Sequence, residues 1–322
     1  MKQSLFRPPI GALPQTQRVF LPKFAKRGVR RLELAQERVR CPMRKICRAA
    51  VSLPLALLAA QALGKPAIIP LEPPLTYADA ADLALASTIV AEVRITTAER
   101  VDGKLMPVPP STRRYLVNAS VTALIRGAAG LPPSISYLTD VRADSLGRYA
   151  ALKKQAVIVF AVAVPNRPGQ IRLVAPDAQR ISTPKFSAQA RAILAEALGP
   201  NAPPRILRVG DAFQVPGTVP GESETQIFLS ADDGRPLSLS IWRRQNEAPR
   251  WSVSLGEIVD ESAVPPKRDT LLWYRLACFL PRTLPAASTD SLDADEAKAA
   301  AEDYATVIKG LGPCERTRLL AR

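Results

Sequence analysis

The side chains that best suit binding chemistry lie in two consecutive stretches near residue 240. If PLSLSIWRR (236–244) forms a strand, its leucines and isoleucine share one face, and Trp242 and Arg244 lie on the opposite face. In the next expected strand, Arg250 is out of phase with the apolar residues in the same way. An exposed tryptophan beside arginines is typical of an interaction hot spot. We therefore expect a binding surface formed by Trp242, Arg244 and Arg250.

The alternative for Trp242 is a structural role. In that interpretation the helices expected at the C-terminal end cover the indole, and no binding surface forms. Trp251 differs, because it is in phase with Val253 and Leu255. We expect Trp251 in the core.

Few residue types in the chain support catalysis. There is no histidine, which excludes Ser-His-Asp and Cys-His catalysis and removes the imidazole ligands that are usual in zinc sites. The motifs GxGxxG, GxxxxGK[ST] and GxSxG do not occur. Surface charge in loops explains two acidic pairs, Asp140 with Asp144 and Glu222 with Glu224. We predict no catalytic residue, no cofactor and no metal site, although a carboxylate or Ser-Lys enzyme stays open.

Cys278 and Cys314 are the two cysteines of the chain that follow residue 64. Two cysteines in an exported protein most often pair with each other. A disulfide between them would stabilise the fold by about 4 kcal/mol in the chain-entropy account. A reactive thiol would need an activating neighbour, and the chain offers no histidine for that role.

Export is indicated by MRKICRAAVSLPLALLAAQALGKPA, residues 43–67. A methionine and a basic cluster precede an apolar run and then small residues, which is the order of a secretory signal peptide. The apolar run is shorter than the roughly 20 residues that span a bilayer, and Pro54 interrupts it. A buried core helix is the alternative. We predict cleavage near Ala62 or Gly64.

This interpretation places a signal peptide at 43–64 and makes residues 1–42 a disordered or mis-called extension that precedes the true start at Met43. The mature protein would be periplasmic or secreted and would have no transmembrane anchor. Its oligomeric state is left open.

Most of the positive charge lies in the segment that would be removed. The whole chain has 44 basic and 29 acidic residues, a formal charge of +15. Residues 1–64 hold 13 of the basic and 2 of the acidic residues, so 31 and 27 remain, a charge of +4. Because so small a net charge does not indicate nucleic-acid binding, we predict an unknown protein or envelope component as the partner.

The periodicity of residues 65–180 predicts one short helix and several half-buried strands. The helix is expected at 76–87, and the strands at 88–97, 114–126, 134–141, 155–164 and 171–174. The apolar run in the strand at 155–164 should be covered on both faces. So many strands in about a hundred residues predict a small closed or nearly closed barrel.

The second half of the chain is expected to contain more strands and three helices. Residues 181–204 should form a helix, at 184–198, and a linker. Residues 205–265 should form an antiparallel meander with strands at 206–215, 225–231, 236–244 and 250–259. Residues 266–322 should form a disulfide-stapled helical hairpin from helices at 269–280 and 293–312. The predicted fold class is therefore α+β, mostly β.

Residues 80–170 resemble the OB-type barrels of netrin-like and metalloproteinase-inhibitor domains. The resemblance rests on VNASVTALIRGAAGLPPSISYLTDV and the strongly apolar strand that follows it. Those inhibitors coordinate the metal of the target enzyme through an N-terminal cysteine, and the predicted N-terminus of the mature chain has no cysteine. The whole chain resembles uncharacterised exported proteins of Gram-negative bacteria, a resemblance that implies no particular activity.

Together these observations predict an exported, non-catalytic binding or interaction protein of the cell envelope. Two alternatives remain. The barrel resemblance implies a proteinaceous inhibitor of a secreted hydrolase, and the carboxylates leave room for a histidine-independent enzyme.

Overall fold

The computed structural model describes residues 75–318, apart from 105, 129 and 257–263. Over these residues the chain is mixed α+β and mostly β, with two antiparallel sheets, ten strands and four α-helices. This confirms the predicted fold class. The predicted signal peptide at 43–64 and the extension at 1–42 lie outside the described residues.

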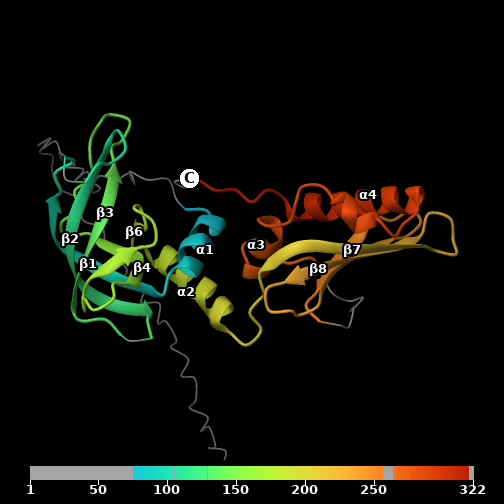
Figure 1. Ribbon diagram of the computed structural model, residues 1–322, viewed down its shortest axis with the longest axis horizontal. Helices are drawn as coiled ribbons and strands as arrows, with labels where there is room; N and C mark the ends of the chain where they lie inside the picture. The colour runs from blue at the N-terminus through green and yellow to red at the C-terminus, as the bar shows by residue number, and fades with distance from the viewer. Residues whose placement is uncertain (1–74, 105, 129, 257–263, 319–322) are drawn as a thin grey trace, which may run out of the picture. The chain divides into compact units, whose positions relative to one another are not determined.

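The first sheet contains six strands in the order β3-β2-β1-β4-β5, with β6 also paired to β4. Figure 1 shows β1, β2 and β3 side by side. In β1 the side chains alternate, with Val93 and Ile95 buried and Arg94 and Thr96 exposed, as period two predicts. The strands are β1 Ile89–Arg100, β2 Thr112–Arg126, β3 Ser134–Arg142, β4 Ala156–Ala163, β5 Ile171–Leu173 and β6 Gln179–Ile181.

The first sheet does not close into the barrel that we expected for residues 65–180. Its edges approach each other at a single parallel bridge between Ser136 and Gln170. A hydrogen bond from Asp140 N to Pro176 O, 2.8 Å long, adds a second link. β5 is only three residues long, and the chain then turns to pair β6 with β4. So short a strand cannot provide a continuous ladder for β3.

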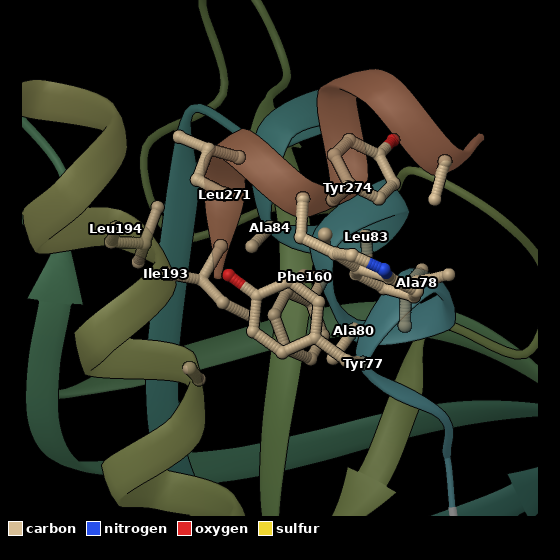
Figure 2. Close-up of a cluster of buried hydrophobic side chains, with 14 of the residues drawn as sticks. Tyr77, Ala78, Ala80, Leu83, Ala84, Phe160, Ile193, Leu194, Leu271 and Tyr274 are labelled. Carbon is tan, nitrogen blue, oxygen red and sulfur yellow. The ribbon is translucent and has the colours of Figure 1, made fainter. Parts of the chain in front are cut away.

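Three helices form an apolar cluster against β4 (Figure 2). They are α1 Tyr77–Ala86, α2 Pro184–Leu198 and α3 Leu271–Ala277. Figure 2 shows Leu83 of α1, Phe160 of β4, Ile193 of α2 and Leu271 of α3 around a common centre, and all four are buried. Because α3 lies far along the chain, this cluster joins residues near 80 to residues near 270.

The second sheet is a four-stranded meander in the order β10-β9-β8-β7. One face carries Ile227, Leu239 and Ile241, which are buried. Helix α4, Ala294–Leu311, packs on this face, and Figure 1 shows it alongside β7. A Cβ at Gly310 of α4 would lie 2.7 Å from Nε1 of Trp251, so the glycine permits this close approach. The strands are β7 Ile206–Pro216, β8 Ser223–Ala231, β9 Leu237–Arg243 and β10 Arg250–Ser254.

The predicted helical hairpin is present, with α3 and α4 in contact. A disulfide joins Cys278, just after α3, to Cys314, just after α4. Asp293 caps α4 and forms a capping box with Glu296. A short 3₁₀ helix at Ala286–Thr289, which we did not predict, lies between the two helices.

Beyond the disulfide, the chain returns to α1 and is held there by the carboxylate of Asp79. This residue is 0 % exposed. Its oxygens accept hydrogen bonds from Thr76 Oγ1 (2.9 Å), from Thr317 N and Oγ1 (both 2.8 Å), and from Arg318 N (3.3 Å). Thr76 and Asp79 also form the capping box of α1. The same carboxylate therefore begins a helix and anchors a segment about 240 residues away.

Two further acidic residues hold the same C-terminal segment. Asp82 accepts bonds from Arg316 Nε (2.7 Å) and Tyr274 Oη (2.5 Å). Asp177 pairs with Arg318, whose side chain is 4 % exposed. Residues 316–318 are thus bound through backbone and side chains together.

Replacing the buried carboxylate should destabilise the whole fold. Burial alone would raise the pKa of Asp79, but the hydrogen bonds from Thr317, Thr76 and Arg318 together lower it below its ordinary value of 3.8. In the Asp79→Asn variant, an amide NH₂ would face backbone and hydroxyl donors. We expect a loss of about 3 kcal/mol in the free energy of unfolding at pH 7, measured by urea denaturation.

The pH dependence provides an independent check. Since the pKa of Asp79 is lower in the folded chain than in the unfolded chain, its contribution is complete above about pH 4 and is lost as the pH falls through the folded-state value. The wild type should therefore lose more stability than Asp79→Asn below pH 3.8. Asp211→Asn, at an exposed position of β7, is the matched control and should behave like wild type. Equal stability of Asp79→Asn and Asp211→Asn would contradict this account.

Candidate functional site

The structure brings the three residues of the predicted binding surface together. In the strand register, Trp242 of β9 lies between Glu224 of β8 and Arg250 of β10. Paired residues of neighbouring strands point to the same face, so these three side chains form a row. Arg244, two residues after Trp242, follows on the same side of the chain just beyond the end of β9.

A tight turn completes the site. The chain between β9 and β10 reverses at residues 244–247, where Glu247 N donates to Arg244 O (3.2 Å) and Asn246 has φ 61°. Asparagine is one of the few side chains that tolerates this left-handed conformation. The turn places Glu247 and Ala248 beside the row. The site has a hollow of about 130 Å³, lined by Glu224, Trp242, Arg244, Glu247, Ala248 and Arg250. We call these six residues the Trp242 surface.

The four charged groups of the Trp242 surface make no ion pair with any residue that the structure describes. Arg243, which precedes Arg244, does form an ion pair. Its Nε donates to Asp303 of α4 at 2.5 Å. Successive side chains of a strand point to opposite faces. Arg243 therefore serves the core interface with α4, and Arg244 and Arg250 are available to a ligand.

The alternative that the C-terminal helices cover Trp242 does not hold for the helix that packs on this sheet. Asp303 of α4 contacts Thr225 and Arg243, which share the face opposite Trp242. Trp251 lies on that opposite face and is 8 % exposed, in keeping with its expected place in the core. Trp242 is half-buried.

Sequence reasoning missed three members of the Trp242 surface, Glu224, Glu247 and Ala248. Glu224 was considered only as a partner of Glu222. The signal that could have found it is the hairpin register, because the turn at Asp232–Gly234 determines which residue of β8 lies opposite Trp242. Glu247 depends on the conformation of the turn at 244–247, which the sequence pattern leaves open.

The other acidic pair has structural roles. Asp140 forms a bidentate ion pair with Arg114, with distances of 2.6 and 2.7 Å. Asp144 accepts from the backbone N–H groups of Leu146 and Arg148, and these contacts lower its pKa. Asp140 and Asp144 therefore make separate contacts and do not form a pair.

The arrangement of the Trp242 surface suits binding. It offers an indole face, two guanidinium groups as donors and two carboxylates as acceptors. Aromatic residues with a few polar groups around them are usual in ligand sites.

Comparison with protein-family models and with curated proteins finds no match to this chain. Among the helices of the described residues, none combines the length and the apolar character needed to cross a bilayer.

The geometry of the Trp242 surface can be tested by fluorescence. The chain has three tryptophans, of which Trp251 and Trp273 are 8 % and 3 % exposed. Trp242 should therefore account for most of the quenching by acrylamide, and Trp242→Phe should remove it. Trp251→Phe is the control and should retain the quenching. Strong quenching that persists in Trp242→Phe would show that Trp242 is not the accessible tryptophan.

Proposed function

We propose that this chain is an exported, non-catalytic binding protein of the cell envelope that uses the Trp242 surface. The observation that carries the proposal is the row of Glu224, Trp242 and Arg250 beside a hollow, with charged groups that no described residue pairs. Unpaired arginines around a tryptophan are the composition of a binding hot spot.

The proposal of export rests on the leader pattern at 43–64 and on the disulfide. A disulfide is compatible with an oxidising compartment, because such bonds are rare in the cytosol. The mature protein in this proposal is periplasmic or secreted.

The proposed likeness of the first sheet to an OB-type barrel concerns strand order. β1 pairs with β2 and β4, β2 with β3, and β4 with β5, and a parallel bridge links β3 to the segment just before β5. A five-stranded, partly open barrel is the description of the OB fold. The two alternative functions, a hydrolase inhibitor and a histidine-independent enzyme, stay predictions, since no contact among the described residues favours either.

The export proposal predicts a specific product in a Gram-negative host that expresses the full chain. The intact mass of the protein recovered from the envelope fraction should correspond to a chain that begins just after Ala62 or Gly64. Cys278 and Cys314 should resist alkylation until a reductant is added. A cytosolic product that keeps residues 1–42 and has free thiols would contradict the proposal.

The binding proposal predicts that the purified mature chain sediments with a cell-envelope fraction. The Trp242→Ala/Arg250→Ala double variant should lose about 2 kcal/mol or more of binding free energy, roughly 30-fold in affinity. Arg100→Ala, at an exposed arginine of β1, is the matched control and should bind like wild type. Equal sedimentation of wild type and the double variant would show that the Trp242 surface does not bind the envelope fraction.

A further inference from the structure

The Trp242 surface has balanced charge. Two carboxylates, Glu224 and Glu247, and two guanidinium groups, Arg244 and Arg250, line the same hollow. An anionic ligand would meet both carboxylates, and a cationic ligand would meet both arginines. The lining therefore has no net electrostatic preference for an anion or a cation.

A zwitterion could match both signs, but such contacts contribute little at this site. Glu224, Arg244, Glu247 and Arg250 are all exposed. Ion pairs in such surroundings are screened and add little affinity. Hydrogen bonds between a charged side chain and a neutral hydroxyl remain favourable and do not require a second ion to be desolvated.

The indole specifies the shape of the ligand. Trp242 lines the hollow and lies in the strand register between Glu224 and Arg250, so a ligand there meets an apolar indole with an acceptor on one side and a donor on the other. The matching ligand has one apolar C–H face and hydroxyl groups around its rim. The negative face of the indole favours such C–H groups.

The size of the hollow points to a small group. Its volume of about 130 Å³ is below the range of about 300–1,000 Å³ that is usual for drug-sized ligands. The turn at 244–247 is held by its own hydrogen bond, so one wall of the hollow exists before binding. Preorganisation of this kind lowers the entropy cost of binding.

Two more aromatic rings lie on the same face of the sheet. Phe213 and Phe228 are 50 % and 39 % exposed, and their centroids are 5.8 Å apart. Phe228 is four residues along β8 from Glu224, or about 14 Å at the usual strand rise. A ligand that contacts both Trp242 and this pair must extend over about 14 Å.

We propose that the Trp242 surface binds a neutral carbohydrate, with one pyranose ring stacked on Trp242 and further units extending toward Phe213 and Phe228. This inference rests on the proposed binding function and names the ligand class for the same site. Arg244 and Arg250 donate to sugar oxygens, and Glu224 and Glu247 accept from sugar hydroxyls.

The test titrates the mature chain with N-acetylglucosamine, its β-1,4-linked tetramer and maltotetraose, monitored by tryptophan emission and calorimetry. At least one tetrasaccharide should bind. Its affinity should exceed that of the single sugar by about tenfold, because the longer chain also contacts Phe213 and Phe228. Trp242→Ala should weaken binding at least tenfold, and Trp242→Phe should restore part of it. Near-ultraviolet circular dichroism checks that each variant is folded.

A variant at a distant exposed arginine is the mutational control, and salt dependence and charged probes separate a neutral ligand from a charged one. Arg100→Ala should leave the affinity unchanged. Raising the salt concentration from about 0.05 to 0.5 M should change the dissociation constant less than twofold, since no net charge is neutralised. Polygalacturonate and a mixture of free amino acids serve as the anionic and zwitterionic probes. Binding of either in place of the neutral glycans would overturn the inference.

The outcomes also distinguish this inference from the proposed function. If neutral glycans fail to bind but the envelope fraction still requires Trp242 and Arg250, the ligand class is wrong and the binding function stands. If neither binds, both proposals fail.

Discussion

The structure depends on the buried carboxylate of Asp79. A charge with no exposure to water is tolerated only if its oxygens are fully hydrogen-bonded. Here the donors come from Thr76, the N-cap of α1, and from Thr317 and Arg318 at the other end of the described chain. Asp82 and Asp177, whose side chains are 19 % and 40 % exposed, add ion pairs with Arg316 and Arg318. The C-terminal segment is thereby fastened to α1, and the disulfide at Cys314 holds the same segment to α3.

The two faces of the second sheet differ. One is occupied by α4, and at its centre Asp303 accepts bonds from Thr225 and Arg243. The other carries Trp242, Glu224 and Arg250, whose charged groups have no partner among the described residues. Arg243 and Arg244 are consecutive, yet the pleat directs one to a buried carboxylate and the other to the hollow. A rigid sheet supported from one side is a suitable base for a binding surface on the other.

The first sheet shows where local pattern and global closure diverge. Alternation in β1 and β2 and the apolar run in β4 were sufficient to predict these strands. Closure of a barrel depends on the lengths and registers of the last strands. Residues 171–181 provide two short strands that share β4 as partner, so the edge of β3 receives a single bridge and a few hydrogen bonds.

By itself, the sequence determined the α+β class, the position of each α-helix to within a few residues, and the face of β9 on which Trp242 lies. These properties follow from periodicity and capping, which act between neighbours in the chain. The sequence also indicated the Cys278–Cys314 pair, because few cysteines were available. Only the tertiary structure decided that Glu224 and Glu247 join Trp242, that Asp303 takes Arg243, and that Asp79 binds residues 317 and 318. Those contacts depend on strand register, turn conformation and the packing of distant segments. Of these, only the register of β8 and β9 has a local signal, the turn at Asp232–Gly234.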